Sequence, residues 1–138
     1  MPKLIMVVDD NEVILELYHT LLEEEGYQVS SFAYAPLNLE LIKQLKPDLA
    51  ILDLLFRNED LGWQLIQAMK LEPITARIPI ILCTADMVRV KPLQARLREK
   101  KVLVVMKPFD VNELLEAVRK SLETAEYPDD FATEADAD

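Results

Sequence analysis

The sequence has few of the residues that bind soft metals or form disulfides. Its 138 residues include one cysteine, Cys83, and one histidine, His19. A lone cysteine excludes an internal disulfide and favours a reducing cytosol. Together the two side chains cannot build a nitrogen or sulfur metal site. Any metal site in this chain is therefore expected to use oxygen ligands.

The N-terminal region also lacks a long apolar run. Leu4–Val8 is only five residues long and is followed by Asp9 and Asp10. The apolar region of a signal peptide and a membrane span both need longer stretches. We therefore expect a cytoplasmic protein that does not associate with a membrane.

Basic residues are the minority, with 15 lysines and arginines against 25 acidic residues and a formal net charge of -10. This balance repels nucleic acid and suits a protein that meets protein partners. Residues 89–101 are the exception, because they hold six basic residues and one acid, Glu99. This segment is either a solvated helix face or a docking face for an acidic partner or for the acidic end of the chain.

The length and the apolar content of 51% suit one domain with a core of its own and leave no room for a second folded domain. Residues 126–138 contain six acids and no bases. Such a composition cannot bury enough apolar surface to order itself. We expect a folded domain over residues 1–125 and an acidic, disordered tail over residues 126–138.

Short apolar runs of strand length alternate with helical patterns. The runs are apolar on both faces, which is typical of a parallel sheet covered by helices on both sides. The order strand then helix, five times, predicts an α/β fold with a doubly wound, five-stranded parallel sheet, whose ligand site lies beyond the carboxyl ends of the strands. The predicted strands are Leu4–Val8, Tyr27–Phe32, Leu49–Leu52, Ile78–Cys83 and Val102–Met106.

Three helices show an apolar stripe at helical spacing. Gly26 is placed to end the first helix, and Asp110 with Glu113 resembles a capping box at the start of the last one. These stripes predict which face of each helix packs on the sheet. They consist of Val13, Leu17 and Leu21; of Leu61, Leu65, Ile66 and Met69; and of Val111, Leu114, Leu115, Val118 and Leu122.

Polar residues follow four of the predicted strands. They are the pair Asp9 and Asp10, then Asp53, Thr84 and Lys107. Taken singly, these are ordinary helix caps, turn residues or surface charges. Together they meet at one edge of a parallel sheet, where three carboxylates repel one another unless a cation joins them. Oxygen ligands with room for water and phosphate oxygens favour Mg²⁺.

With these motifs the sequence resembles the receiver domains of two-component response regulators, of the single-domain, chemotaxis-regulator-like kind, over residues 3 to about 124. The motifs are Val7-Val8-Asp9-Asp10-Asn11, Leu52-Asp53-Leu54, Cys83-Thr84-Ala85 and Met106-Lys107-Pro108-Phe109. The resemblance implies a flavodoxin-like sheet with strand order 2-1-3-4-5.

The resemblance also implies a role for each motif residue. Asp53 would be the nucleophile that becomes phosphorylated, and Thr84 and Lys107 would act with it. Thr84, Ala85 and Val104 would form the switch, and the peptide bond before Pro108 would be cis. The metal ligands would be Asp9, Asp10, Asp53 and the carbonyl of Leu55.

The implied function is a phosphorelay switch rather than an enzyme, since the chain would catalyse only its own phosphorylation and dephosphorylation. A histidine kinase or a His-phosphotransfer protein would donate the phosphoryl group. A downstream protein target would bind, with the 89–101 segment and the fifth strand as its docking region, and a homodimer is a further possibility. No direct contact with nucleic acid is expected.

Two departures from the family put parts of this in question. Val104 stands where most receivers carry an aromatic switch residue, and the loop after Asp53 lacks the usual Met-Pro and carries Gly62 one position late. The main alternative is therefore a receiver-like scaffold that binds partners without phosphorylation. A flavin carrier is disfavoured because Asp9 and Asp10 would repel its phosphate. A dehalogenase-type phosphatase needs an acid where Leu55 stands.

Overall fold

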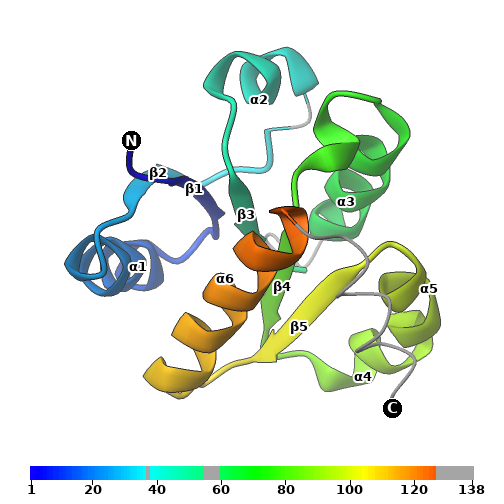
Figure 1. Cartoon of the computed structure of the whole chain (residues 1–138). Coiled ribbons are helices and arrows are strands. Elements are labelled where there is room, and N and C mark those ends of the chain that lie inside the picture. The colour runs from blue at the N-terminus through cyan, green and yellow to red at the C-terminus, as the bar shows by residue number, and fades with distance from the viewer. Residues whose placement is uncertain (37, 55–59, 127–138) are drawn as a thin grey trace.

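A computed structural model describes residues 1–36, 38–54 and 60–126. Five parallel strands form one sheet in the order β2-β1-β3-β4-β5 (Figure 1). This confirms the predicted sheet and its strand order. The strands are β1 (Leu4–Val8), β2 (Gln28–Phe32), β3 (Leu49–Leu52), β4 (Ile80–Thr84) and β5 (Val102–Met106).

Helical segments connect successive strands. In the fourth connection two short helices, α4 and α5, are joined by the 3-10 turn Lys91–Leu93, which contains Pro92. Proline has no backbone N–H to donate to the preceding turn, so one continuous helix is disfavoured there. The helices are α1 (Glu12–Glu24), α2 (Leu39–Leu45), α3 (Leu61–Leu71), α4 (Met87–Val90), α5 (Gln94–Glu99) and α6 (Val111–Glu126), and a second 3-10 turn spans Thr75–Arg77.

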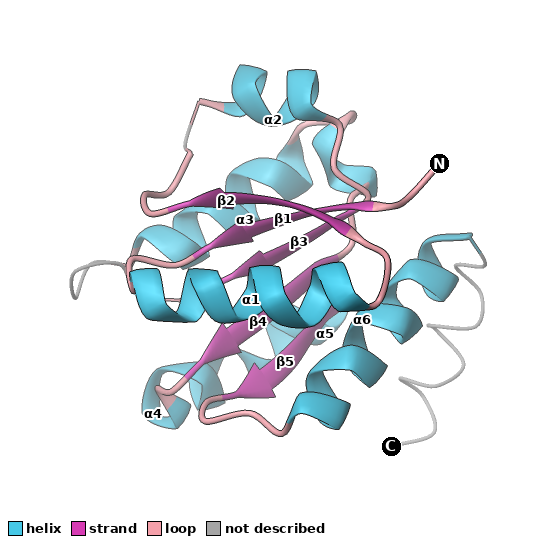
Figure 2. Ribbon diagram, turned by 90° about the vertical axis from the view of Figure 1, so that its left-hand side faces the viewer, coloured by secondary structure: helices cyan, strands magenta, loops and turns pink. Residues whose placement is uncertain are grey.

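The central strands are buried on both faces, as their continuous apolar sequence predicts. All four residues of β3 are fully buried, and alternate residues feed two separate cores. Helices α1 and α6 cover one face of the sheet and α2 to α5 cover the other; Figure 2 shows α1 and α6 in front of the strands. Within the described part of the chain, no helix has the length and apolar character needed to cross a membrane.

The predicted core face of α1 was wrong for Val13 and Leu17, whereas Leu21 is partly buried and packs against the core. Val13 is 72% exposed and Leu17 is 38% exposed, whereas the buried residues of this helix are Leu15, Tyr18 and Leu22. Both stripes are apolar, so periodicity alone does not choose between them. The structure favours the stripe with Tyr18, whose ring stacks on Phe109 at 5.9 Å between centroids. Val111 of the predicted α6 stripe is also more exposed than predicted: it is 42% exposed in the first turn of that helix.

The other predicted stripes and caps agree with the structure. Leu65, Ile66 and Met69 of α3 are fully buried, and Leu114 and Val118 of α6 are fully buried. Asp110 Oδ1 accepts hydrogen bonds from the backbone N–H groups of residues 112 and 113, which caps α6 at its predicted start. Strand β4 begins two residues later than predicted, because the backbone N–H of Ile78 donates to the Thr75 carbonyl in the 3-10 turn.

Gly62 lets the start of α3 pack directly on the end of β3. Its backbone N–H donates to the Leu54 carbonyl at 3.0 Å. A Cβ atom at this position would lie 2.0 Å from the Asp53 carbonyl oxygen and 2.5 Å from that of Leu54. Both contacts are with backbone, so no side-chain rotation relieves them. The backbone of Asp53 is therefore held in place by the first turn of α3 as well as by the sheet.

We expect Gly62→Ala to destabilise the fold by about 1–3 kcal/mol or more, because helix and strand must separate to admit the methyl group. Urea unfolding gives the stability, and the amide signal of Asp53 in NMR spectra reports the strand end, which should shift. The control is Gly26→Ala, where φ is +89° but no atom lies within 4 Å. That change should cost about 1 kcal/mol of backbone strain and leave Asp53 unmoved. Equal effects of the two changes would contradict the packing argument.

Candidate functional site

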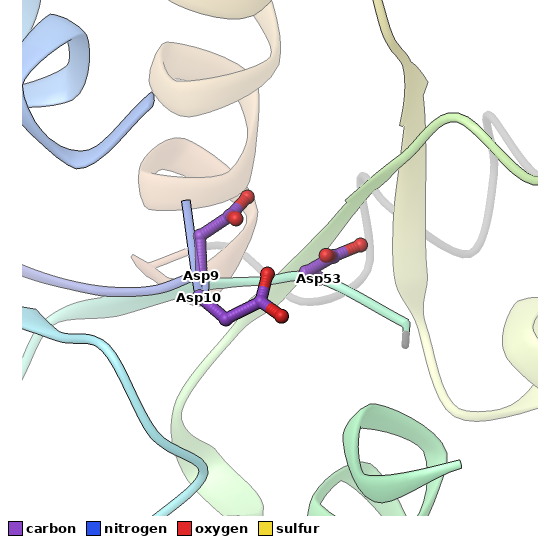
Figure 3. Close-up of side chains that lie close together, drawn as sticks. All are labelled: Asp9, Asp10 and Asp53. Atoms are coloured by element: carbon purple, nitrogen blue, oxygen red, sulfur yellow. The ribbon is translucent and has the colours of Figure 1, made fainter. Parts of the chain in front are cut away.

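Three carboxylates meet at the carboxyl edge of the sheet. Asp9 and Asp10 follow β1, and Asp53 follows the neighbouring strand β3. One oxygen from each carboxylate lies within 4.8 Å of the others, and Figure 3 shows the three side chains together. Backbone bonds continue the sheet through two of them: the Asp9 N–H donates to the Phe32 carbonyl at 3.1 Å and the Asp53 N–H to the Val8 carbonyl at 3.0 Å. The grouping therefore follows from the strand register.

Lys107, which follows β5, supplies an ammonium group to this cluster. Its Nζ donates a hydrogen bond to Asp9 Oδ2 and lies 3.8 Å from Asp53 Oδ2. The three side chains are between 2% and 16% exposed. Burial lowers the pKa of Lys107, but the hydrogen bond that Lys107 donates to Asp9 and the charge of Asp53 outweigh this effect, so the pKa lies above its usual value. Lys107 is therefore protonated. The peptide bond between Lys107 and Pro108 is cis, as the resemblance implied.

The environment of Asp53 changes the protonation of its carboxyl group. Burial raises its pKa from 3.8 to about 6, and the charges of Asp9 and Asp10 act in the same direction. The charge of Lys107 and the backbone N–H of Leu54 oppose this and lower the pKa. One lysine thus compensates only part of the charge of three carboxylates. A divalent cation beside Asp53 would stabilise its charged form further.

Thr84 lies at the end of β4 beside an open hollow of about 520 Å³ that reaches Asp53. Its Oγ1 accepts a hydrogen bond from the Asp86 N–H at 3.2 Å, and Asp86 in turn caps α4 by accepting from the Arg89 N–H at 3.0 Å. Thr84 therefore links the hollow to the start of α4. The hollow is lined by Asp53, Thr84, Ala85, Asp86, Met87, Val88 and Lys107.

The structure brings Asp9, Asp10, Asp53, Thr84 and Lys107 to one edge of the sheet, as the order of the motifs predicts. Ala85 lines the same hollow as Asp53 and Thr84, whereas Val104 lies apart from this group. Val104 is half-buried in β5 and packs against the core on the α2 to α5 side, and Leu55 is outside the described residues.

Sequence reasoning assigned no role to two residues that support the site. Asn11 caps α1 by accepting from the Val13 N–H at 2.9 Å, while its own N–H donates to Asp9 Oδ1 at 2.9 Å. Asp9 is therefore bonded through both oxygens. Tyr18 is buried close to Asp9 and Cys83, and burial raises the pKa of its hydroxyl, which stays neutral. An Asn directly before a helical stripe is a capping signal, whereas the role of Tyr18 depends on the helix face.

Comparisons with known proteins agree with this geometry. The family model described as "Response regulator receiver domain" matches residues 5–119. The sporulation initiation phosphotransferase F of Bacillus subtilis is 32% identical over 126 residues, which cover 86% of this chain and 92% of that protein. The DNA-binding dual master transcriptional regulator RpaA of Synechocystis is 33% identical over 125 residues, covering 88% of this chain. The match spans about half the length of RpaA, 49%.

Solved structures show the same fold. The response regulator receiver domain protein (CheY-like) of Methanospirillum hungatei superposes with a TM-score of 0.78 at 28% identity, covering 93% of this chain and 99% of that one. The family match, the strand order and the similarity to solved receivers lead to one conclusion. The chain belongs to the response regulator receiver domain family of two-component systems.

Replacing Asp53 by Asn should stabilise the metal-free protein at neutral pH. Because the pKa of Asp53 is raised to about 6 in the folded chain, folding favours its neutral form. The neutral form contributes stability that is complete below the unfolded pKa and is lost as pH rises through the folded pKa. We expect metal-free Asp53→Asn to exceed wild type by roughly 1–3 kcal/mol near neutral pH.

The measurement is urea unfolding in chelator at several pH values, with the same titration in Mg²⁺ as control. The advantage of Asp53→Asn should disappear as the pH falls below the unfolded pKa of about 4, because the wild-type carboxyl is then protonated in both states. It should also shrink in Mg²⁺, because the cation stabilises the carboxylate. A stability difference that does not depend on pH would contradict the raised pKa.

Proposed function

We propose that this receiver domain accepts a phosphoryl group on Asp53 in a Mg²⁺-dependent reaction and passes the signal to a protein partner. The observation that carries the proposal is the carboxylate cluster of Asp9, Asp10 and Asp53 with Lys107 bonded to it. A donor phosphohistidine on a histidine kinase or a His-phosphotransfer protein fits this site. The donor reaches Asp53 through the open hollow beside Thr84.

The donor atoms of the cluster fit Mg²⁺. All three side chains offer carboxylate oxygens, which are hard ligands, and one is exposed and two are at least half-buried. Asp9, Asp10 and Asp53 would hold the ion, and the carbonyl of Leu55 is the proposed remaining protein ligand. When bound, Mg²⁺ supplies positive charge to the phosphoryl oxygens in the transition state.

The residues of the chain provide the rest of the reaction. A carboxylate oxygen of Asp53 attacks phosphorus while the bond from phosphorus to the donor imidazole nitrogen breaks. The products are an acyl phosphate on Asp53 and a donor imidazole, which becomes neutral when its nitrogen takes up a proton. Lys107 already lies 3.8 Å from Asp53 and contributes its ammonium charge to the same oxygens. Because the reaction consumes the charged form of Asp53, groups that lower its pKa also favour phosphorylation.

The product would act as a switch through Thr84. The phosphoryl group adds negative charge beside a hydroxyl that now accepts from the Asp86 N–H, and Thr84 can donate its own hydrogen to a phosphoryl oxygen. Movement of Thr84 and Ala85 would displace the cap of α4. Val104 is aligned with Leu82 in the sheet and has no aromatic ring to rotate. We therefore propose that the signal passes through the backbone at residues 84–86 rather than through a side chain of β5.

The proposed partners are described by the region of the chain that they would bind. The 89–101 segment with β5 is the proposed docking region for the downstream target, and a homodimer and a cytoplasmic location stay predictions. The DNA-binding function named for RpaA belongs to a protein about twice as long as the matched region. A scaffold that binds without phosphorylation is the less favoured function, because it gives no reason for Lys107 and three carboxylates to share one edge.

Phosphorylation should be confined to Asp53 and should require Mg²⁺. The protein is incubated with acetyl phosphate, and the mass increase of one phosphoryl group is measured by mass spectrometry. We expect the adduct in wild type with Mg²⁺ and none in Asp53→Ala or in excess chelator. Glu116→Gln, an exposed change in α6, is the control and should behave as wild type. An adduct of unchanged yield in Asp53→Ala would exclude Asp53 as the acceptor.

Lys107→Ala should impair switching more than folding when Mg²⁺ is present. Removing the lysine leaves Asp9, whose side chain is 2% exposed, without its cation. In chelator we expect a loss of roughly 1–3 kcal/mol for the unpaired carboxylate, and in Mg²⁺ a smaller loss because the ion replaces the charge. Thermal unfolding measures both. The phosphorylation-dependent shift of the Ala85 and Asp86 amide signals in NMR spectra should disappear, and a wild-type shift would show that Lys107 is not needed for the switch.

A further inference from the structure

A second hollow lies at the opposite edge of the sheet from Asp53. It has a volume of about 390 Å³, and we call it the basic pocket. Pro79 and Lys101 precede β4 and β5, so the basic pocket lies at the amino ends of these parallel strands, whereas Asp53 lies beyond a carboxyl end. Its lining residues are Lys70, Ala76, Arg77, Pro79, Lys101, Thr124 and Ala125.

The positive charges of the basic pocket have no acidic partner among the described residues. The ion pairs of the described chain include none to Lys70, Arg77 or Lys101. Lys70 is half-buried, and its Nζ donates a hydrogen bond to the Ala76 carbonyl at 3.4 Å. This bond uses one N–H group of the ammonium but does not neutralise its charge. Burial lowers the pKa of Lys70, and the charges of Lys101 and Lys100 lower it further. In a chain with a net charge of -10 this group of cations is a local positive site that would attract an anion.

The shape of the basic pocket adds a second requirement. Ala76, Pro79 and Ala125 give it an apolar part, and the three cations stand beside that part. A simple inorganic anion would satisfy the charges and leave the apolar part in water. A segment that carries several carboxylates together with an aromatic side chain matches both.

The chain has such a segment directly after the end of α6 in the sequence. Residues 127–138 carry five acids, no bases and two aromatic residues, Tyr127 and Phe131. They follow α6, whose last turn contributes Thr124 and Ala125 to the pocket wall. A tethered segment has an effective concentration in the millimolar range. We propose that the basic pocket binds the acidic segment 127–138 of the same chain.

This proposal separates the two readings of the basic 89–101 segment. Of its six basic residues only Lys101 lines the basic pocket, while Lys91 and Arg96 are exposed on the α4 to α5 side. Binding of the acidic segment would therefore occupy the sheet edge and leave that helix side free for a partner. The proposal does not depend on phosphorylation, so the Asp53 experiments and the test below can fail separately.

The test compares two pairs of substitutions in the full chain by NMR. Lys70→Gln with Lys101→Gln removes two charges from the basic pocket, and Lys91→Gln with Arg96→Gln removes two from the exposed helix side. We expect the amide signals of Asp129, Asp130 and Phe131 to shift in the pocket pair and to stay at their wild-type positions in the control pair. Equal shifts in both pairs would show that residues 129–131 respond only to the net charge of the protein, and this would overturn the proposal.

A reciprocal variant protects the test against a folding defect in the pocket pair. Replacing the five acids of residues 127–138 by their amides should shift the amide signals of Ala76 and Arg77, and about 0.5 M salt should move the wild-type signals in the same direction. Signals of Ala76 and Arg77 that do not change would overturn the proposal. Shifts that depend on protein concentration would also overturn the proposal, because they would indicate binding by a second copy. Shifts that appear only when inorganic phosphate is added would overturn it too, because they would indicate binding of a free anion.

Discussion

The repulsion among three carboxylates held at one edge of the sheet is the constraint on which the rest of the structure depends. Strand register places Asp9, Asp10 and Asp53 together whether or not their charges are compensated. The hydrogen bond from the Asn11 N–H to Asp9 and the close packing of Gly62 on the Asp53 backbone hold two members of this cluster in place. The fold thus concentrates negative charge that a cation or a proton must neutralise. Burial, together with the charges of Asp9 and Asp10, keeps the pKa of Asp53 raised despite the opposing charge of Lys107.

Most of the fold could be read from the sequence because buried parallel strands leave a strong signal. The bounds of β1, β3 and β5 match the apolar runs, and the strand ends identify the polar edge. Strand ends that are set by backbone hydrogen bonds were harder to predict. The start of β4, for example, depends on a 3-10 turn that the hydrophobic periodicity does not indicate. The face of α1 was missed because two apolar stripes compete, and the buried stripe is the one on which Tyr18 stacks on Phe109 beside Leu15 and Leu22.

The site was predicted at the level of residue types but not of contacts. The order of the motifs placed Asp53, Thr84 and Lys107 at one edge, yet it did not show that Lys107 bonds Asp9 more closely than Asp53. Nor did it show the support from Asn11, since that bond depends on where α1 begins. The basic pocket was also invisible in the sequence, because Lys70, Arg77 and Lys101 come from three different segments.

The contact of Gly62 with the backbone of Asp53 has a consequence for protein design. Transplanting the acidic residues and the lysine into another doubly wound sheet would reproduce the side chains but not the carbonyl positions behind them. The recipient would also need a glycine where its third helix enters, at the same spacing from the strand end. A functional graft must therefore carry the strand, the connecting loop and the first turn of α3 as one unit.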